Sequence, residues 1–196
     1  MTNTKGRELF TIMEIYRILV DGMRTAPLLS RARRNQDIDK PFMERIMLAV
    51  TEVNGCALCS YAHAKMALDA GLSNGEIQKM MKGSFEDAPT DQMTAILFAQ
   101  HYADSRSVPD QSAWDYLNNH YGTVKAEGIL GAIRIITMGN ALGIPWGSFW
   151  GRFRGKPDRR SSLGYELGIF FSLIFVFPVA MIHATVWMIA RRPIVK

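Results

Sequence analysis

Apolar residues in the first three quarters of the chain recur every three or four positions, which is the spacing of one face of an α-helix. Three stretches show it: Phe10, Met13, Ile15 and Ile18; Phe42, Ile46, Ala49 and Val53; and Met93, Ile96, Leu97 and Phe98. Strand-like alternation of apolar and polar residues does not extend over any useful length. The pattern therefore predicts an all-α domain over residues 1–149.

Residues that favour helix ends divide this domain. Starts are predicted by Asp39-Lys40-Pro41, by a capping box from Ser73 to Glu76, and by Asp87-Ala88-Pro89-Thr90 and Val108-Pro109-Asp110. Ends are predicted by Asn54-Gly55 and by Gly71. Together these signals predict seven helices, with no internal repeat.

The last quarter of the chain has a different pattern, because residues 167–190 form 24 consecutive positions without Asp, Glu, Lys or Arg. A helix of that length is about 36 Å long, enough to cross a hydrocarbon core of about 30 Å. Polar residues do not form a face at helical spacing, which argues against the alternative of a buried core helix. We expect a transmembrane helix at 165–190, after a basic linker at 150–164 and before a basic tail at 191–196.

Charge supports this division. The formal net charge is +5, but residues 1–149 carry 15 basic and 16 acidic side chains, whereas residues 150–196 carry 8 and 2. The excess of positive charge therefore flanks the apolar stretch, and nucleic acid is not an expected partner. Five basic residues before the stretch and three after it favour a single-pass protein of the cytoplasmic membrane with its main domain in the cytoplasm. The N-terminus lacks the pattern of a secretory signal.

Candidate chemistry is concentrated at Cys56 and Cys59, the two cysteines of the chain, with His63 following. The spacing places all three on one helix face, with Cys56 in the first turn. A helix N-terminus and a nearby imidazole favour the thiolate, so the pair suits redox chemistry. Two alternatives stay open at this point: a zinc site completed by a carboxylate, and inert thiols.

The motif and its surroundings resemble the alkylhydroperoxidase D and carboxymuconolactone decarboxylase superfamily. The resemblance rests on Glu44 followed by Cys56-x-x-Cys59-x-x-x-His63, on the stretch EVNGCALCSYAHAKMALDAGLSNGEI, and on Asn140 to Pro145. It covers roughly residues 10–147 and implies an alkylhydroperoxidase D-like helical domain that assembles into trimers or hexamers. It also favours the redox interpretation, because the true decarboxylases lack the cysteine pair.

The resemblance implies a mechanism with no cofactor beyond the cysteine pair and no metal. Cys59 is then the thiolate that attacks a hydroperoxide, Cys56 resolves the sulfenic acid as a disulfide, and Glu44 and His63 form a proton relay. A lipoyl-like or thioredoxin-like dithiol reduces the disulfide. Leu58 stands where relatives commonly carry His or Tyr, which removes one polar group from the relay.

His183 is the one ionisable residue in the stretch 167–190. It is either a neutral histidine bonded to a neighbouring helix or a ligand to a tetrapyrrole such as bacteriochlorophyll or haem. The stretch from Val179 to Trp187, ending in Arg192-Pro193, resembles the single-span antenna polypeptides of purple photosynthetic bacteria. This suggests an alternative function as a non-catalytic or pigment-binding subunit of a membrane complex.

Overall fold

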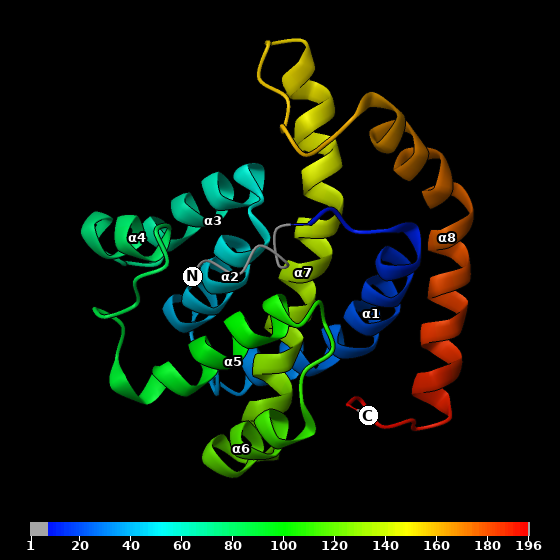
Figure 1. Cartoon of the computed structure of the whole chain (residues 1–196). Helices are drawn as coiled ribbons and strands as arrows, with labels where there is room; N and C mark the ends of the chain where they lie inside the picture. The colour runs from blue at the N-terminus through cyan, green and yellow to red at the C-terminus, as the bar shows by residue number, and fades with distance from the viewer. Residues whose placement is uncertain (1–7, 196) are drawn as a thin grey trace.

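The computed structural model describes residues 8–195 and contains, within them, eight α-helices and a short 3-10 helix but no strand (Figure 1). The helices are α1 (Ile12–Arg34), α2 (Lys40–Asn54), α3 (Ala57–Asp69), α4 (Asn74–Met80), α5 (Met93–Asp104), α6 (Gln111–Tyr121), α7 (Thr123–Arg152) and α8 (Leu163–Ile189), with the 3-10 helix η2 at Thr90–Gln92. The all-α prediction and the final apolar helix are confirmed. The first seven residues of the N-terminal segment and Lys196 of the basic tail lie outside the described residues.

Helix α7 is the centre of the fold, and the other long helices pack around it (Figure 1). Its most extensive contact is with α1, where the two backbones approach closely at Gly131. A Cβ atom at this position would lie 2.9 Å from the carbonyl oxygen of Thr25, so only glycine allows this approach. α7 runs to Arg152 and therefore continues past the domain end expected at residue 149.

Local signals set several helix ends as expected. Asp39 accepts a hydrogen bond from the Phe42 amide (2.8 Å), and Gly55 ends α2 in the left-handed conformation with a φ of 67°. Ser73 likewise caps α4 by accepting from the Glu76 amide (3.1 Å). The returning half of this capping box was predicted wrongly, because the Glu76 carboxylate instead accepts from Arg45 Nε at 2.6 Å.

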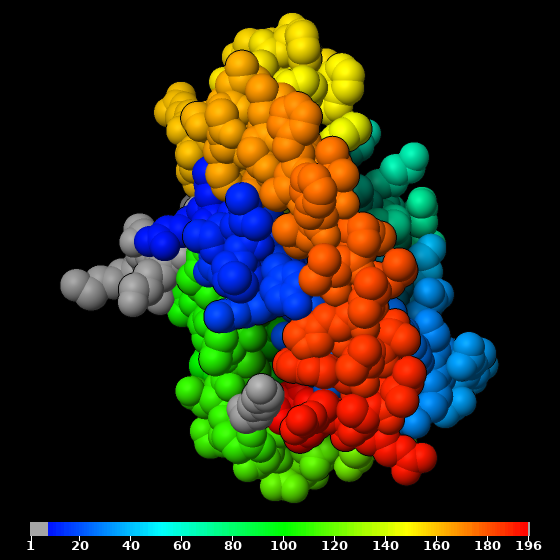
Figure 2. All heavy atoms as spheres, turned by 90° about the vertical axis from the view of Figure 1, so that its right-hand side faces the viewer, coloured from blue at the N-terminus to red at the C-terminus, as the bar shows by residue number. Residues whose placement is uncertain are grey.

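Helix α8 lies along the side of the helical domain rather than projecting from it, and Figure 2 shows it beside α1 over the height of one face. Its first turn is held by an ion pair from Arg152 to the buried Glu166 (2.7 Å). In the same turn, the Tyr165 hydroxyl donates to the Phe10 carbonyl oxygen (2.9 Å). The connection between α7 and α8 therefore folds back onto the domain.

Two helices are long and apolar enough to cross a membrane, α7 and α8, but they differ in burial. In their most apolar windows, 72% of the residues of α7 are buried and 17% of those of α8. α7 is therefore the core helix of the domain, whereas α8 has an exposed apolar surface. We call it the outer face of α8, and its large exposed side chains are Phe171, Ile174, Phe175, Phe177, Val179, Met181, Ile182, Val186, Met188 and Ile189.

Candidate functional site

Cys56 and Cys59 form a disulfide at the start of α3, with their Cα atoms 5.3 Å apart. Gly55 turns the chain sharply after α2, so that Cys56 is the residue that caps α3, one position before the first turn in which the sequence placed it. Its Sγ lies 3.3 Å from the Cys59 amide nitrogen, which donates to it. Both cysteines are buried, with 1% and 8% of their surface exposed. A helix N-terminus stabilises negative charge, so this position favours thiolate once the pair is reduced.

The two sulfurs lie against the backbone of α7. A Cβ atom built at Gly143 would be 2.8 Å from Cys59 Sγ and 3.1 Å from Cys56 Sγ. Cys59 Sγ is also 3.6 Å from the carbonyl oxygen of Gly139, one turn earlier on the same helix. Glycine at position 143 therefore provides the space that the disulfide occupies.

Glu44 and His63, which are 19 positions apart, meet between α2 and α3. Glu44 Oε2 lies 2.8 Å from His63 Nδ1. The Glu44 side chain is 1% exposed and that of His63 is 14% exposed. A hydrogen bond between a buried carboxylate and an imidazole fixes the ring orientation and the nitrogen that carries the proton. The structure thus pairs Glu44 of α2 with His63 of α3, and His63 follows Cys59 by one helical turn on the helix that the cysteine pair begins.

Comparison with known proteins bears on this part of the chain. Residues 24–101 match the sequence model of the carboxymuconolactone decarboxylase family. A stretch of 48 residues is 44% identical to the alkyl hydroperoxide reductase AhpD of Coxiella burnetii, in strains Dugway 5J108-111 and RSA 331 / Henzerling II. It covers 24% of this chain and 27% of the relative, so the chain spans about a quarter of the length of the curated relatives that it matches. No solved structure matches the chain significantly.

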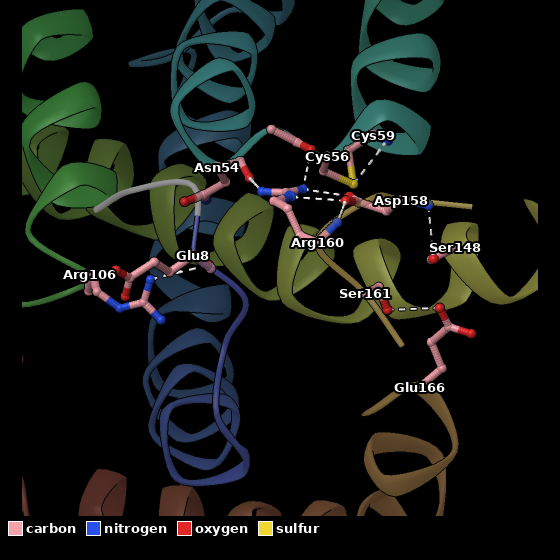
Figure 3. A network of polar contacts seen from close by, with 11 residues as sticks. Glu8, Asn54, Cys56, Cys59, Arg106, Ser148, Asp158, Arg160, Ser161 and Glu166 are labelled. Atoms are coloured by element: carbon pink, nitrogen blue, oxygen red, sulfur yellow. Dashed lines mark hydrogen bonds and ion pairs between the residues drawn. A yellow bond between two sulfur atoms is a disulfide. The ribbon is translucent and has the colours of Figure 1, made fainter. Parts of the chain in front are cut away.

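Arg160 lies close to the disulfide and was not identified as a site residue from the sequence. It comes from the basic linker and donates to the carbonyl oxygens of Asn54 (3.1 Å) and Gly55 (2.8 Å), immediately before Cys56 (Figure 3). Its partner Asp158 (2.6 Å) holds it in place, and this hydrogen bond lowers the pKa of the Asp158 carboxyl. Positive charge at the C-terminal end of a helix is favourable, so Arg160 stabilises the turn that leads into the disulfide.

The histidines of α5 and α6 have partners outside this site. His101 Nε2 is 3.7 Å from Asp110, and His120 packs edge-on against Tyr121. The side chain of Leu58, between the two cysteines, is 46% exposed. It therefore does not place a buried group beside the proton relay that the sequence predicts. Within residues 8–195, no group of three or more His, Cys, Asp or Glu side chains could hold a metal ion.

His183 faces the helical domain. Its Nδ1 is 2.5 Å from the Tyr16 hydroxyl of α1, and its ring lies edge-on to Trp187 with the ring centres 4.3 Å apart. This is the arrangement of a histidine bonded to a neighbouring helix. Tetrapyrrole ligation by His183 stays a prediction.

Proposed function

We propose that this protein is a thiol-dependent peroxidase and disulfide oxidoreductase that reduces alkyl hydroperoxides. The observation that carries the proposal is a buried Cys56–Cys59 disulfide at the start of the helix on which His63, one turn later, is hydrogen-bonded to Glu44, in a segment that matches the carboxymuconolactone decarboxylase family model. The similarity of 48 residues to proteins named alkyl hydroperoxide reductase supports the choice of substrate.

The reaction starts from the reduced pair. The Cys59 thiolate attacks the distal oxygen of the hydroperoxide, an S–O bond forms, the O–O bond breaks, and the alkoxide leaves as an alcohol after taking a proton. His63 supplies that proton through Nε2, because Nδ1 is held by Glu44. The Cys56 sulfur then attacks the Cys59 sulfenic acid, and hydroxide leaves as water with the proton of the Cys56 thiol. An external dithiol, lipoyl-like or thioredoxin-like, is oxidised to its own disulfide and returns both cysteines to thiols.

The test uses the full chain in a non-ionic detergent, an alkyl hydroperoxide and dihydrolipoamide as the dithiol. Cys59→Ser is expected to abolish turnover, whereas Cys56→Ser keeps a single round and accumulates a sulfenic acid that dimedone traps. Ser60→Ala, next to the pair, is the matched control. Turnover that survives Cys59→Ser would contradict the mechanism.

We also propose that α8 attaches the protein to the cytoplasmic membrane, with the main domain in the cytoplasm. The outer face of α8 is an exposed apolar surface, continuous with an aromatic cluster at the end of α7. Trp146 and Phe149 of this cluster pack against Phe170 of α8, and Trp150 and Phe153 pack against Phe149. Such a surface is typical of contact with lipid or with a partner in a membrane complex.

The docked position of α8 bears on its topology. If α8 crossed the bilayer in this position, Glu14, Arg17 and Asp21 of α1, which line a pocket together with His183, would lie at the depth of the hydrocarbon. We therefore propose attachment through the outer face while the inner face stays on the domain. A single span, the topology expected from sequence, requires α8 to separate from α1.

Protease treatment of spheroplasts separates these two topologies. A C-terminal tag is expected to be protected, as an N-terminal tag is, because both ends of the docked chain stay on the cytoplasmic side. Cleavage of the C-terminal tag alone would establish the single span and exclude the docked attachment.

The outer face of α8 also favours a second candidate function, that of a subunit of a photosynthetic or respiratory membrane complex. In that case His183 Nε2 is the atom that would hold a bacteriochlorophyll or haem, because Nδ1 already bonds Tyr16. Pigment that co-purifies from native membranes with the wild type but not with His183→Leu would support this function. A colourless protein that turns over hydroperoxide would support the first.

A further inference from the structure

A pocket of about 500 Å³ lies between α1, the loop after α5, and the C-terminal end of α8, on a different part of the molecule from the disulfide. Its polar lining includes Arg24 from α1 and Arg134 from α7. The two arginines are 5% and 4% exposed, so their guanidinium groups are almost completely removed from water. Buried charges of this kind are costly unless they are paired.

The two arginines are incompletely paired. Asp21 is the carboxylate that they share, at 3.7 Å from Arg24 and 3.8 Å from Arg134, both long for an ion pair. Arg24 Nε and Arg134 Nη1 are buried and have no hydrogen-bond partner among the residues that the structure describes. Burial lowers the pKa of Arg24; the charge of Arg134 lowers it further, and Asp21 opposes both effects. The site therefore has unused donors and an excess of positive charge.

The rest of the lining agrees with an anionic ligand. The other acidic residue, Glu14, is already paired with Arg106 at 2.7 Å, and Arg17 adds another positive charge. Up to residue 195, the C-terminal segment contributes carbonyl oxygens to the two arginines: those of Arg192 and Pro193 accept from Arg24, and that of Ile194 accepts from Arg134. These neutral acceptors leave the excess charge in place.

The position of the pocket points to a source for the anion. It lies at the end of α8, where the Trp187 ring packs under the Arg24 guanidinium at 4.8 Å and Arg191 and Arg192 follow. Tryptophan and arginine at the end of an apolar helix are typical of the layer in which lipid headgroups lie.

We propose that this pocket binds a phosphate-type anion, held by the Arg24 and Arg134 guanidinium groups. Phosphate oxygens point in several directions, so one group can accept hydrogen bonds from two planar guanidinium groups on different helices. The phosphate is either free in solution or the headgroup of an anionic phospholipid. This site is independent of the thiol chemistry, so its failure and that of the peroxidase proposal are distinguishable.

The experiment measures the melting temperature of the full chain in a non-ionic detergent at constant ionic strength. Three ligands are titrated separately: inorganic phosphate, dihexanoyl phosphatidylglycerol, and zwitterionic dihexanoyl phosphatidylcholine as the control. A ligand that binds the folded state raises the melting temperature in a saturable way. A rise in melting temperature with inorganic phosphate shows that free phosphate is sufficient for binding. A rise with phosphatidylglycerol alone shows that the ligand is the lipid headgroup.

Two variants test whether the pocket carries the effect. Arg24→Gln is expected to weaken binding by about tenfold or more, since it removes a charge-assisted contact. Arg33→Gln, at an exposed position on the same helix, is the matched control and keeps the wild-type response. Val108→Trp fills the pocket from a side chain that is 69% exposed, so it blocks binding without touching either arginine, even if Arg24→Gln does not fold. The absence of a saturable shift with either anion, or an unchanged shift in Val108→Trp, would overturn the proposal.

Discussion

Glu44 is the residue whose surroundings most constrain the chemistry of the site. Its side chain is 1% exposed, and His63 is the partner that balances the burial of its carboxyl group. The sequence named Glu44 through a family resemblance and not through its spacing, because residues 44 and 63 lie on two different helices. Their contact depends on the turn at Gly55, which sets the angle between α2 and α3.

Glu44→Gln tests the relay. The amide keeps the shape of the side chain but removes the carboxylate that orients His63, so the hydroperoxide turnover rate is expected to fall by about 10²-fold or more. Steady-state kinetics with saturating dithiol measures it. Glu52→Gln, two turns later on the same helix, removes the same charge and is the control. Equal losses in both variants would show that Glu44 acts only through general electrostatics.

Gly143 is expected to be intolerant of a side chain. A Cβ atom 2.8 Å from Cys59 Sγ would force the disulfide to move, and overpacking of this kind costs about 1–3 kcal/mol. Gly143→Ala should therefore lower the melting temperature of the oxidised protein. The loss should be smaller after reduction, when the sulfurs can separate.

Gly139→Ala is the matched control for this prediction, one turn earlier on α7. Its Cβ atom would meet only Ile136 Cδ1, at an ordinary 3.7 Å. Alanine there should stabilise the helix by about 0.5–1 kcal/mol in both redox states. A destabilised Gly139→Ala, or a stabilised oxidised Gly143→Ala, would contradict the packing described above.

At the scale of elements, the start of α1 is joined to the loop after α5. Glu14 closes a capping box with Thr11 and also accepts from Arg106 Nε and Nη2, at 2.7 Å and 2.8 Å. The hydrogen bond from Arg106 is the main cause that lowers the pKa of Glu14 to about 2, from an ordinary value of 4.5. The Glu14 carboxylate therefore caps the start of α1 and also holds the loop after α5 against it. α1 in turn packs against α8.

This arrangement predicts a pH dependence. Because the pKa of Glu14 is lower in the folded state, its contribution to stability is complete above about pH 4.5 and is lost as the pH falls towards 2. The difference in the free energy of unfolding between wild type and Glu14→Gln should be largest near neutral pH and should shrink as the pH falls from about 4.5 towards 2. Denaturant unfolding at several pH values measures it, with Glu86→Gln at an exposed site as the control. A difference that does not change with pH would exclude the Arg106 pair as its source.

At the scale of the whole molecule, α8 is held on the domain by contacts between residues more than 150 positions apart. The Tyr16 hydroxyl bonds His183, Tyr165 bonds the Phe10 carbonyl, and Arg24 bonds the carbonyls after α8. These polar groups occupy the inner face, whereas the outer face is apolar. The docked α8 therefore has an inner side with polar contacts and an apolar outer side, although its sequence shows no polar face.

Tyr16→Phe tests the docking. It removes the bond to His183 and is expected to cost about 1 kcal/mol, and to speed hydrogen exchange of amides in the C-terminal half of α8. Tyr61→Phe, at a tyrosine that is 74% exposed on α3, is the control. If α8 exchanges equally fast in the wild type and both variants, the docked position is not the stable one in solution.

Local sequence patterns predicted the features of the fold that depend on near neighbours. Apolar residues at helical spacing, Pro41, Gly55 and Ser73 placed helices and their ends, because caps and amphipathic faces involve residues within a few positions. The motif from Cys56 to His63 could be recognised for the same reason, since its three residues lie within eight positions at one end of one helix. The contacts between distant segments became visible only in the folded structure.

Those contacts are the meeting of Glu44 with His63, the place of Gly143 behind the sulfurs, the reach of Arg160 to the turn before Cys56, and the docking of α8. Each depends on how helices pack, and packing is set by the combined shape of many side chains rather than by a local pattern. The incomplete capping box at Ser73 has the same cause. Glu76 has a local partner within reach, but the ion pair with Arg45, 31 positions away, binds it instead.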